Sequence, residues 1–134
     1  MTTNKELIQK AISVINKKEF EDSSMGGVGS ALVTDEGNIY TGVCIDTSSS
    51  MGFCAEHNAI GSMITAGEYK IEKIVAVWRD KKGDTYILSP CGRCREFMYR
   101  TNEENLETDV ILAEDKVMKL KELLPYYDWF EKVG

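Results

Sequence analysis

Long apolar runs are missing from this sequence of 134 residues. No stretch approaches the roughly 18 consecutive apolar residues that mark a membrane-spanning helix. The first residues, MTTNKE, also lack the basic start and the apolar run of a secretory signal peptide. We therefore expect a cytoplasmic protein that has no membrane partner.

Positive charge is scarce as well. Lys and Arg together number 16 against 22 Asp and Glu, which gives a formal net charge of -6. Basic residues are concentrated at 81–82 and 93–100, and acidic residues surround both. Because phosphate backbones are held by clustered Lys and Arg, we expect no nucleic-acid partner and favour a small-molecule substrate.

Histidine is nearly absent, since His57 is the only one, whereas there are four cysteines. The cytosol keeps thiols reduced, so we do not expect disulfides. Cys44 stands apart from the others, and as a small buried hydrophobe it needs no metal. The remaining three, Cys54, Cys91 and Cys94, require a chemical explanation.

Hydrophobic periodicity predicts one α/β domain that covers residues 1–134, with no repeat, low-complexity tract or linker. The expected helices are 3–17, 55–66, 91–99 and a turn at 120–124, and the expected strands are 28–34, 39–44, 71–78, 85–88, 109–113 and a short one near 116–118. Asp35-Glu-Gly-Asn is a hairpin-turn sequence, and Gly67 is expected to end the second helix. This order predicts a layered sandwich around one mixed sheet.

The cysteine spacing indicates a metal site. Cys91 and Cys94 form a CxxC pair at the start of a predicted helix, where residues i and i+3 share a face. Cys54 also begins a predicted helix, and helix N-termini favour thiolates. Three protein ligands leave one coordination position open, as in catalytic zinc sites. We therefore expect one zinc ion per chain.

Glu56 supplies an acid–base group beside that site. Zinc lowers the pKa of a bound water to roughly 7, and a neighbouring carboxylate can take the water's proton and deliver it to a leaving amine. Cys-x-Glu followed by a distant Pro-Cys-x-x-Cys has the parts for hydrolytic deamination.

Two other interpretations of the cysteines stay open. A CxxC pair is also typical of redox sites, which would leave Cys54 and Glu56 unexplained. A structural zinc module without turnover would need a fourth ligand, for which His57 is poorly placed and Cys44 lies in a separate element.

Two motifs give the sequence a family likeness. With FCAEHNAI at 53–60 and LSPCGRCR at 88–95, it resembles the cytidine deaminase family. Residues 28–32, 39–43 and 123–125 also look like that family's first two strands and its C-terminal Leu-Leu-Pro. The resemblance implies a homotetramer of three-layer α/β/α subunits, each around one mixed sheet of about five strands. It further implies zinc-dependent hydrolysis at C4 of a free cytosine nucleoside, with release of ammonia, as in pyrimidine salvage.

The resemblance also assigns roles by motif position. Cys54, Cys91 and Cys94 would hold zinc and Glu56 would be the proton shuttle. The backbone around Ala55, Ser89 and Pro90 would line the base pocket.

The sequence departs from the family where the sugar would bind. Cytidine-specific members carry Asn-x-Glu where this chain has Cys44 and Asp46, and their Phe before the first strand is missing here. A thiol is a weak donor and acceptor, so we expect the pocket to bind ribose poorly and plain cytidine to be a weak substrate.

Other features resemble the blasticidin-S deaminases, whose substrate is a modified cytosine nucleoside. These are residues 60–61 (Ile-Gly), the CGRCR sequence, and an aromatic tail of Tyr126, Tyr127, Trp129 and Phe130. The tail is expected either to pack on its own subunit or to form a wall of a neighbouring subunit's pocket.

Charge balance suggests a supporting role next to the metal. Three thiolates and Zn²⁺ carry a net charge of -1, and burying that charge is costly unless it is paired. Relatives usually place Arg directly after Cys-Ala-Glu, where this chain has His57. We hypothesise that Arg93 takes over part of that role, the alternative being an ordinary solvated side chain.

Overall fold

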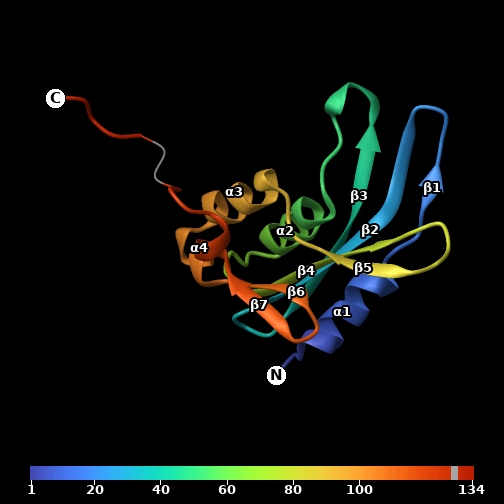
Figure 1. Ribbon diagram of the computed structural model, residues 1–134, viewed down its shortest axis with the longest axis horizontal. Helices are drawn as coiled ribbons and strands as arrows, with labels where there is room; N and C mark the ends of the chain where they lie inside the picture. The colour runs from blue at the N-terminus through green and yellow to red at the C-terminus, as the bar shows by residue number, and fades with distance from the viewer. Residues whose placement is uncertain (128–129) are drawn as a thin grey trace.

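The computed structural model describes residues 1–127 and 130–134 (Figure 1). Its strands are β1 (Lys18–Glu19), β2 (Ser23–Thr34), β3 (Ile39–Thr47), β4 (Ile71–Arg79), β5 (Thr85–Leu88), β6 (Asp109–Ala113) and β7 (Lys116–Lys119). Its helices are α1 (Asn4–Ser13), α2 (Ala55–Thr65), α3 (Gly92–Thr101) and α4 (Leu120–Leu123), with the 3₁₀ turns η1 (Ser48–Ser50) and η2 (Glu103–Glu107). None of these helices has the length and apolar character needed to cross a bilayer.

The strands form one mixed sheet of seven, in which β1, β2, β4, β6 and β7 are neighbours in that order. β3 pairs with β2, β5 pairs with β4, and only the β4–β6 pair is parallel. The resemblance implied about five strands, and the sequence pattern predicted these and a short one near residues 116–118. It missed β1, whose two residues are too short for any periodicity, and the Ser- and Gly-rich first half of β2, which shows no alternation.

Helices cover both faces of the sheet, which confirms the three-layer α/β/α architecture. On one face, α1 packs Leu7 and Ala11 against Val33 and Val75 of the sheet. On the other face, α2 and α3 pack against alternate residues of the same strands, including Leu32. This two-sided burial explains why β4 is an almost uninterrupted apolar run.

Helix α1 begins at a capping box, in which Thr3 and Glu6 bond each other's backbone N–H groups. It ends at Ser13 rather than near residue 17 as predicted. The backbone N–H of Asn16 instead donates to the carbonyl of Gly26 in β2, at 3.0 Å. Pairing with the sheet therefore overrides the helical pattern in the last predicted turn.

Helix α2 lies unusually close to β3 because residue 42 is glycine. A Cβ at Gly42 would approach the backbone nitrogen of Ala59 to 2.4 Å. The side chain of Asn58 donates to the carbonyl of Val43 at 3.1 Å across the same contact. Together these contacts fix the position of α2, and thereby of the residues at its N-terminus.

Candidate metal centre and its pocket

Three cysteine sulfurs meet at the N-termini of two helices. Cys54 is the N-cap of α2, Cys91 is the N-cap of α3, and Cys94 lies one turn into α3. The Sγ atoms of Cys54 and Cys91 are 3.7 Å apart, those of Cys91 and Cys94 are 3.6 Å apart, and all three lie within 4.8 Å of one another. Tetrahedral zinc with Zn–S bonds of about 2.3 Å requires sulfurs about 3.8 Å apart. The donor set and its spacing therefore fit zinc.

The three thiols differ in their environment. Burial raises the pKa of Cys54 and of Cys94. Partial burial also acts on Cys91, but its pKa is lowered because the backbone N–H groups of Cys94 and Arg93 stabilise the thiolate. A coordinated cation deprotonates thiols outright, so a bound ion would convert the whole group to thiolates.

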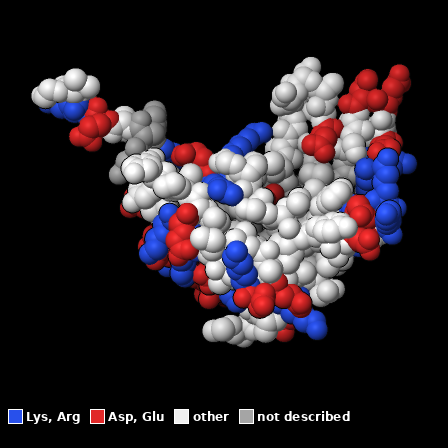
Figure 2. All heavy atoms as spheres, in the orientation of Figure 1, with Lys and Arg blue, Asp and Glu red and all other residues white. Residues whose placement is uncertain are grey.

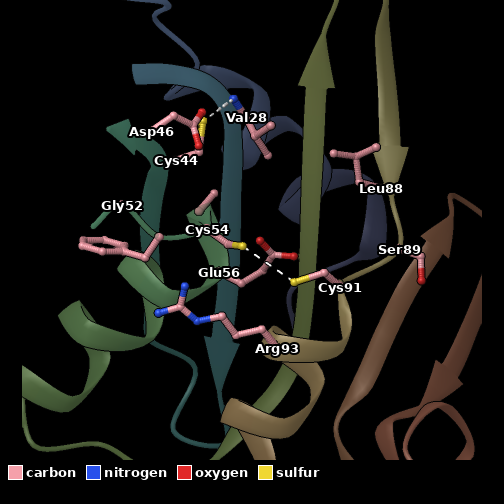
Figure 3. A pocket seen from close by; sticks show the side chains of 12 residues that line it. Val28, Cys44, Asp46, Gly52, Cys54, Glu56, Leu88, Ser89, Cys91 and Arg93 are labelled. Atoms are coloured by element: carbon pink, nitrogen blue, oxygen red, sulfur yellow. Dashed lines mark hydrogen bonds between the residues drawn. The ribbon is translucent and has the colours of Figure 1, made fainter. Parts of the chain in front are cut away.

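Glu56, the second residue of α2, lies next to this group. Its side chain is 6% exposed, and burial raises the pKa of its carboxyl group. Figure 3 shows the carboxylate beside the sulfurs of Cys54 and Cys91. Among the described residues, only the three cysteines form a close group of potential ligands, so Glu56 is a neighbour of the group rather than a fourth member.

A cavity of about 370 Å³ opens onto Cys54, Cys91 and Glu56, whereas Cys94 is fully buried behind them. This volume lies in the range of small-molecule sites. It is lined by Val28, Cys44, Asp46, Gly52, Phe53, Cys54, Ala55, Glu56, Leu88, Ser89, Cys91 and Arg93. The structure thus brings together, from β2, β3, β5, α2 and α3, nearly all of the site residues that the sequence suggested.

Pro90 is the exception among the expected base-pocket residues. It is buried and borders Glu56 and Met98 behind the pocket wall, and it does not line the cavity itself. The carbonyl oxygen of Pro90 accepts a hydrogen bond from Nε of Arg95 at 2.8 Å. This hydrogen bond fixes the turn before α3, and Cys91 is the next residue after Pro90.

The two candidate sugar-binding residues occupy one face of β3. Cys44 is 9% exposed, and its sulfur accepts a hydrogen bond from the backbone N–H of Val28 at 3.3 Å. Asp46, two residues further along β3, is exposed and lines the same cavity. Figure 3 shows both at one end of the pocket, with the Cys54–Cys91 pair further in.

His57 and Arg93 approach the sulfurs in different ways. Nδ1 of His57 lies 3.4 Å from Sγ of Cys94, and its ring stacks on Phe97 with centroids 4.1 Å apart. Burial and the charge of Arg93 lower the pKa of His57. Arg93 lines the cavity and is exposed. Within the described part of the chain its guanidinium makes no hydrogen bond to a sulfur, so the structure places His57 in the contact that the sequence suggested for Arg93.

Sequence reasoning did not anticipate four pocket residues: Val28, Gly52, Phe53 and Leu88. Val28 and Leu88 belong to strands whose alternation places them on the face that α2 and α3 cover, where an apolar residue is expected to belong to the core. Phe53 directly precedes Cys54 in the chain, and this position next to an expected metal ligand could have identified it as a pocket residue.

The family profile described as "Cytidine and deoxycytidylate deaminase zinc-binding region" matches residues 1–108. The chain belongs to this family. The cytidine deaminase of Mycoplasma genitalium is 33% identical over 97 residues, which are 72% of each chain. A probable cytidine deaminase of Dictyostelium discoideum is 42% identical over 71 residues, which are 52% of this chain and 46% of that protein. The chain thus matches about half the length of the latter relative.

Membership in the cytidine deaminase family agrees with the fold. The crystal structure of cytidine deaminase from Mycobacterium leprae matches with a TM-score of 0.73 at 25% identity, covering 93% of this chain and 99% of that one. A blasticidin-S deaminase of Bacillus cereus is 36% identical over 76 residues, 53% of this chain and 54% of that protein. Both parts of the expected resemblance are confirmed, and the family's zinc-binding region confirms zinc as the cofactor.

The C-terminal aromatics divide between two environments. Tyr127 packs against Tyr99 of α3, with ring centroids 4.9 Å apart, whereas Tyr126 is almost fully exposed. Trp129 lies outside the described residues. Figure 1 shows the C-terminal end directed away from the body of the subunit.

Proposed function

We propose that the protein catalyses the hydrolytic deamination of a free cytosine nucleoside, with Cys54, Cys91 and Cys94 holding one zinc ion and Glu56 moving the protons. The observation that carries this proposal is the buried carboxylate of Glu56 beside three sulfurs at the base of a small cavity. A purely structural zinc module has no use for that carboxylate, nor for a cavity that leads to it.

The chemistry follows from the positions of these groups. Bound zinc would supply a Lewis acid and lower the pKa of a water molecule. Glu56 would take a proton from that water and transfer it to the leaving amine, so that the C4–N bond breaks, a C4=O bond forms and ammonia departs. Because Glu56 is largely shielded from solvent, the proton that it takes can pass to the substrate rather than to bulk water.

The size and charge of the surface favour a free nucleoside over a polymer. A cavity of about 370 Å³ suits a molecule of nucleoside size. Figure 2 shows uncharged residues over much of the middle of this face, with acidic and basic side chains mixed around them. The described residues on this face form no continuous basic track of the kind that holds a phosphate backbone. Such an activity would belong to cytoplasmic pyrimidine salvage.

The alternative is a modified cytosine nucleoside such as blasticidin S. The similarity to the Bacillus cereus protein and the pair Cys44 and Asp46 favour it. Cys44 already accepts a hydrogen bond from Val28, so it has only a weak S–H donor to offer a sugar hydroxyl. Asp46 can accept from a hydroxyl, and we expect plain cytidine to have a high KM.

A deamination assay over cytidine, deoxycytidine and blasticidin S tests the proposal, with loss of ultraviolet absorbance as the signal. The matched variants are Cys91→Ser, which removes a soft ligand and should remove most of the zinc and the turnover, and Cys44→Ser, which should keep the zinc. Full zinc occupancy in Cys91→Ser would refute the site. Efficient cytidine turnover that is unchanged by Asp46→Ala would refute the sugar-pocket assignment.

A further inference from the structure

Among the described residues, 1–127 and 130–134, Phe53 is the only aromatic residue that lines the cavity. Its ring is half-buried and belongs to neither hydrophobic cluster of the core. Among the described residues it also stacks on no other aromatic ring. A phenyl ring that the core does not use, and that borders a cavity, is available to a ligand.

The loop before α2 fixes the backbone of Phe53. Its N–H donates to the carbonyl of Ile45 at 2.9 Å, and its carbonyl accepts from the N–H of Ile45 at 3.0 Å. Residue 52 must be glycine for this closure, because a Cβ there would approach the carbonyl oxygen of Ile45 to 1.9 Å. The two hydrogen bonds leave the residue little freedom to leave the pocket wall.

The same loop contains backbone strain. Ser49 and Ser50 both have left-handed conformations, with φ of 61° and 55°. Non-glycine residues adopt this region only where the surrounding structure imposes it, and such residues cluster at ligand sites. Because of this turn, the chain reverses after β3, and Phe53 pairs with Ile45 of β3 two residues before α2 begins.

Phe53 is therefore held next to the reacting end of the pocket. Cys54 follows it immediately and Glu56 comes three residues later. Figure 3 shows Gly52 and Cys54, its two neighbours, on one side of the cavity and Leu88 and Ser89 on the other. The opposite side consists of the aliphatic Leu88 and the polar Ser89, so a flat ring that enters between the two sides meets one aromatic residue, Phe53.

We propose that Phe53 is the stacking wall that sets the plane of the pyrimidine ring, and that it makes the pocket selective for flat heterocycles. This inference rests on the proposed function, because it assumes a pyrimidine ligand. Every base has a π-face, and stacking on an aromatic side chain requires a planar partner. Phe53 is thus a specificity-determining residue, whereas the cysteines and Glu56 act on the reacting atoms.

The test compares two ligands that differ in planarity. The dissociation constants of uridine and of 5,6-dihydrouridine, whose ring is saturated and puckered, are measured on the zinc-loaded protein by titration calorimetry. We expect Phe53→Leu to weaken uridine binding by about 5-fold to 100-fold and dihydrouridine binding much less. Phe53→Trp should preserve the preference for uridine, and Met51→Leu, at an exposed loop position outside the cavity lining, should change neither constant.

An equal loss for both ligands in Phe53→Leu, or no loss, would overturn the inference. Zinc content and the thermal midpoint show whether the variant is folded, and Phe53→Met replaces it if it is not. If the wild-type protein prefers uridine but deaminates no cytosine nucleoside, the proposed function fails alone. If deamination proceeds and the planarity preference does not depend on Phe53, the stacking role fails alone.

Discussion

Glu56 lies at a buried position next to the three cysteines, as the proposed proton shuttle requires. A carboxylate that is 6% exposed loses hydration, and burial of this kind costs free energy unless the group is used or paired. The residue lies within the first turn of α2, two positions after Cys54, so the helix presents it to the same cavity as the sulfurs.

The first prediction concerns this carboxylate. Glu56→Gln keeps the size of the side chain but cannot carry protons, so we expect kcat to fall by about 10²–10⁴-fold or more while zinc content stays at one ion per chain. Glu72→Gln, at an exposed position in β4, is the matched control and should retain full activity. Near-normal turnover in Glu56→Gln would rule out the proton-shuttle role.

The second prediction compares how much His57 and Arg93 each contribute to zinc affinity through the thiolates. Because Nδ1 of His57 lies 3.4 Å from Sγ of Cys94 and Phe97 holds its ring in place, His57→Ala should weaken zinc affinity by about 10-fold to 100-fold. Arg93→Ala tests the charge hypothesis drawn from the sequence and, without a sulfur contact, should have the smaller effect. Competition with a chromogenic chelator measures both, and a larger loss in Arg93→Ala would reverse the assignment.

The sequence predicted the reactive residues of the pocket better than its walls. Two short motifs contain the cysteines and Glu56, because metal ligation and proton transfer require particular atoms at particular spacings. Val28, Phe53 and Leu88 are apolar, and apolar residues are equally common in cores. Only the tertiary structure shows that these three border a cavity.

At the scale of elements, Glu68 ties the end of α2 to the β2–β3 turn. Its Oε2 accepts hydrogen bonds from the hydroxyl of Tyr40 at 2.6 Å and from Nδ2 of Asn38 at 2.9 Å. The nearby hydroxyl of Thr34 and the hydrogen bond from the hydroxyl of Tyr40 are the main reasons why the pKa of Glu68 falls to about 2. The pKa of neighbouring Glu36 is raised, chiefly by its hydrogen bond with Glu68.

This arrangement predicts a pH-dependent contribution to stability. A carboxyl whose folded-state pKa is depressed stabilises the fold above its ordinary pKa of about 4.5 and loses that effect as the pH falls toward 2. Glu68→Gln should therefore lower the thermal midpoint at pH 7, with a difference from wild type that shrinks below pH of about 4.5.

The control for this prediction is Glu36→Gln. This change removes the carboxyl group of Glu36, whose pKa is raised next to Glu68 and which therefore disfavours the folded state at pH 7. The hydrogen bonds from Tyr40 and Asn38 to Glu68 stay intact, so the thermal midpoint at pH 7 should not fall. A difference between Glu68→Gln and wild type that is the same at pH 7 and pH 3 would contradict the assignment.

Apart from β1 and the two 3₁₀ turns, the existence and order of the elements followed from the sequence, whereas several boundaries did not. The capping residue Thr3 lies where the first helix was expected to begin, and the apolar run of β4 lies where a strand buried on both faces was expected. Helix α1 is shorter than its pattern because Asn16 bonds Gly26, a partner ten residues away that periodicity does not reveal.

At the scale of the whole molecule, exposed aromatic residues suggest contacts between subunits. Trp78 and Tyr86 are 42% and 47% exposed and pack on each other across β4 and β5. Tyr126 is 95% exposed. Large exposed apolar side chains of this kind are typical of protein–protein interfaces.

We predict a homotetramer on these grounds and on the resemblance. Sedimentation equilibrium at micromolar concentration should give a mass of about four times the 15.1 kDa chain, because burial of these aromatics favours association. A species of 15.1 kDa alone would contradict the prediction.

The convergence of α2 and α3 on one sulfur group has a consequence for the supply of metal to the protein. Cys54 and Cys91 are 37 residues apart in the chain, so a bound ion ties together two segments that the unfolded chain leaves apart. Ligands that bind only the folded state stabilise it by an amount that grows with their concentration, about 4 kcal/mol at 1,000 times the Kd. Removal of zinc by a chelator should therefore lower the calorimetric thermal midpoint as well as abolish turnover. An unchanged midpoint would show that bound zinc does not stabilise the packing of α2 and α3. We therefore expect a shortage of zinc to lower both the activity and the thermal stability of the protein.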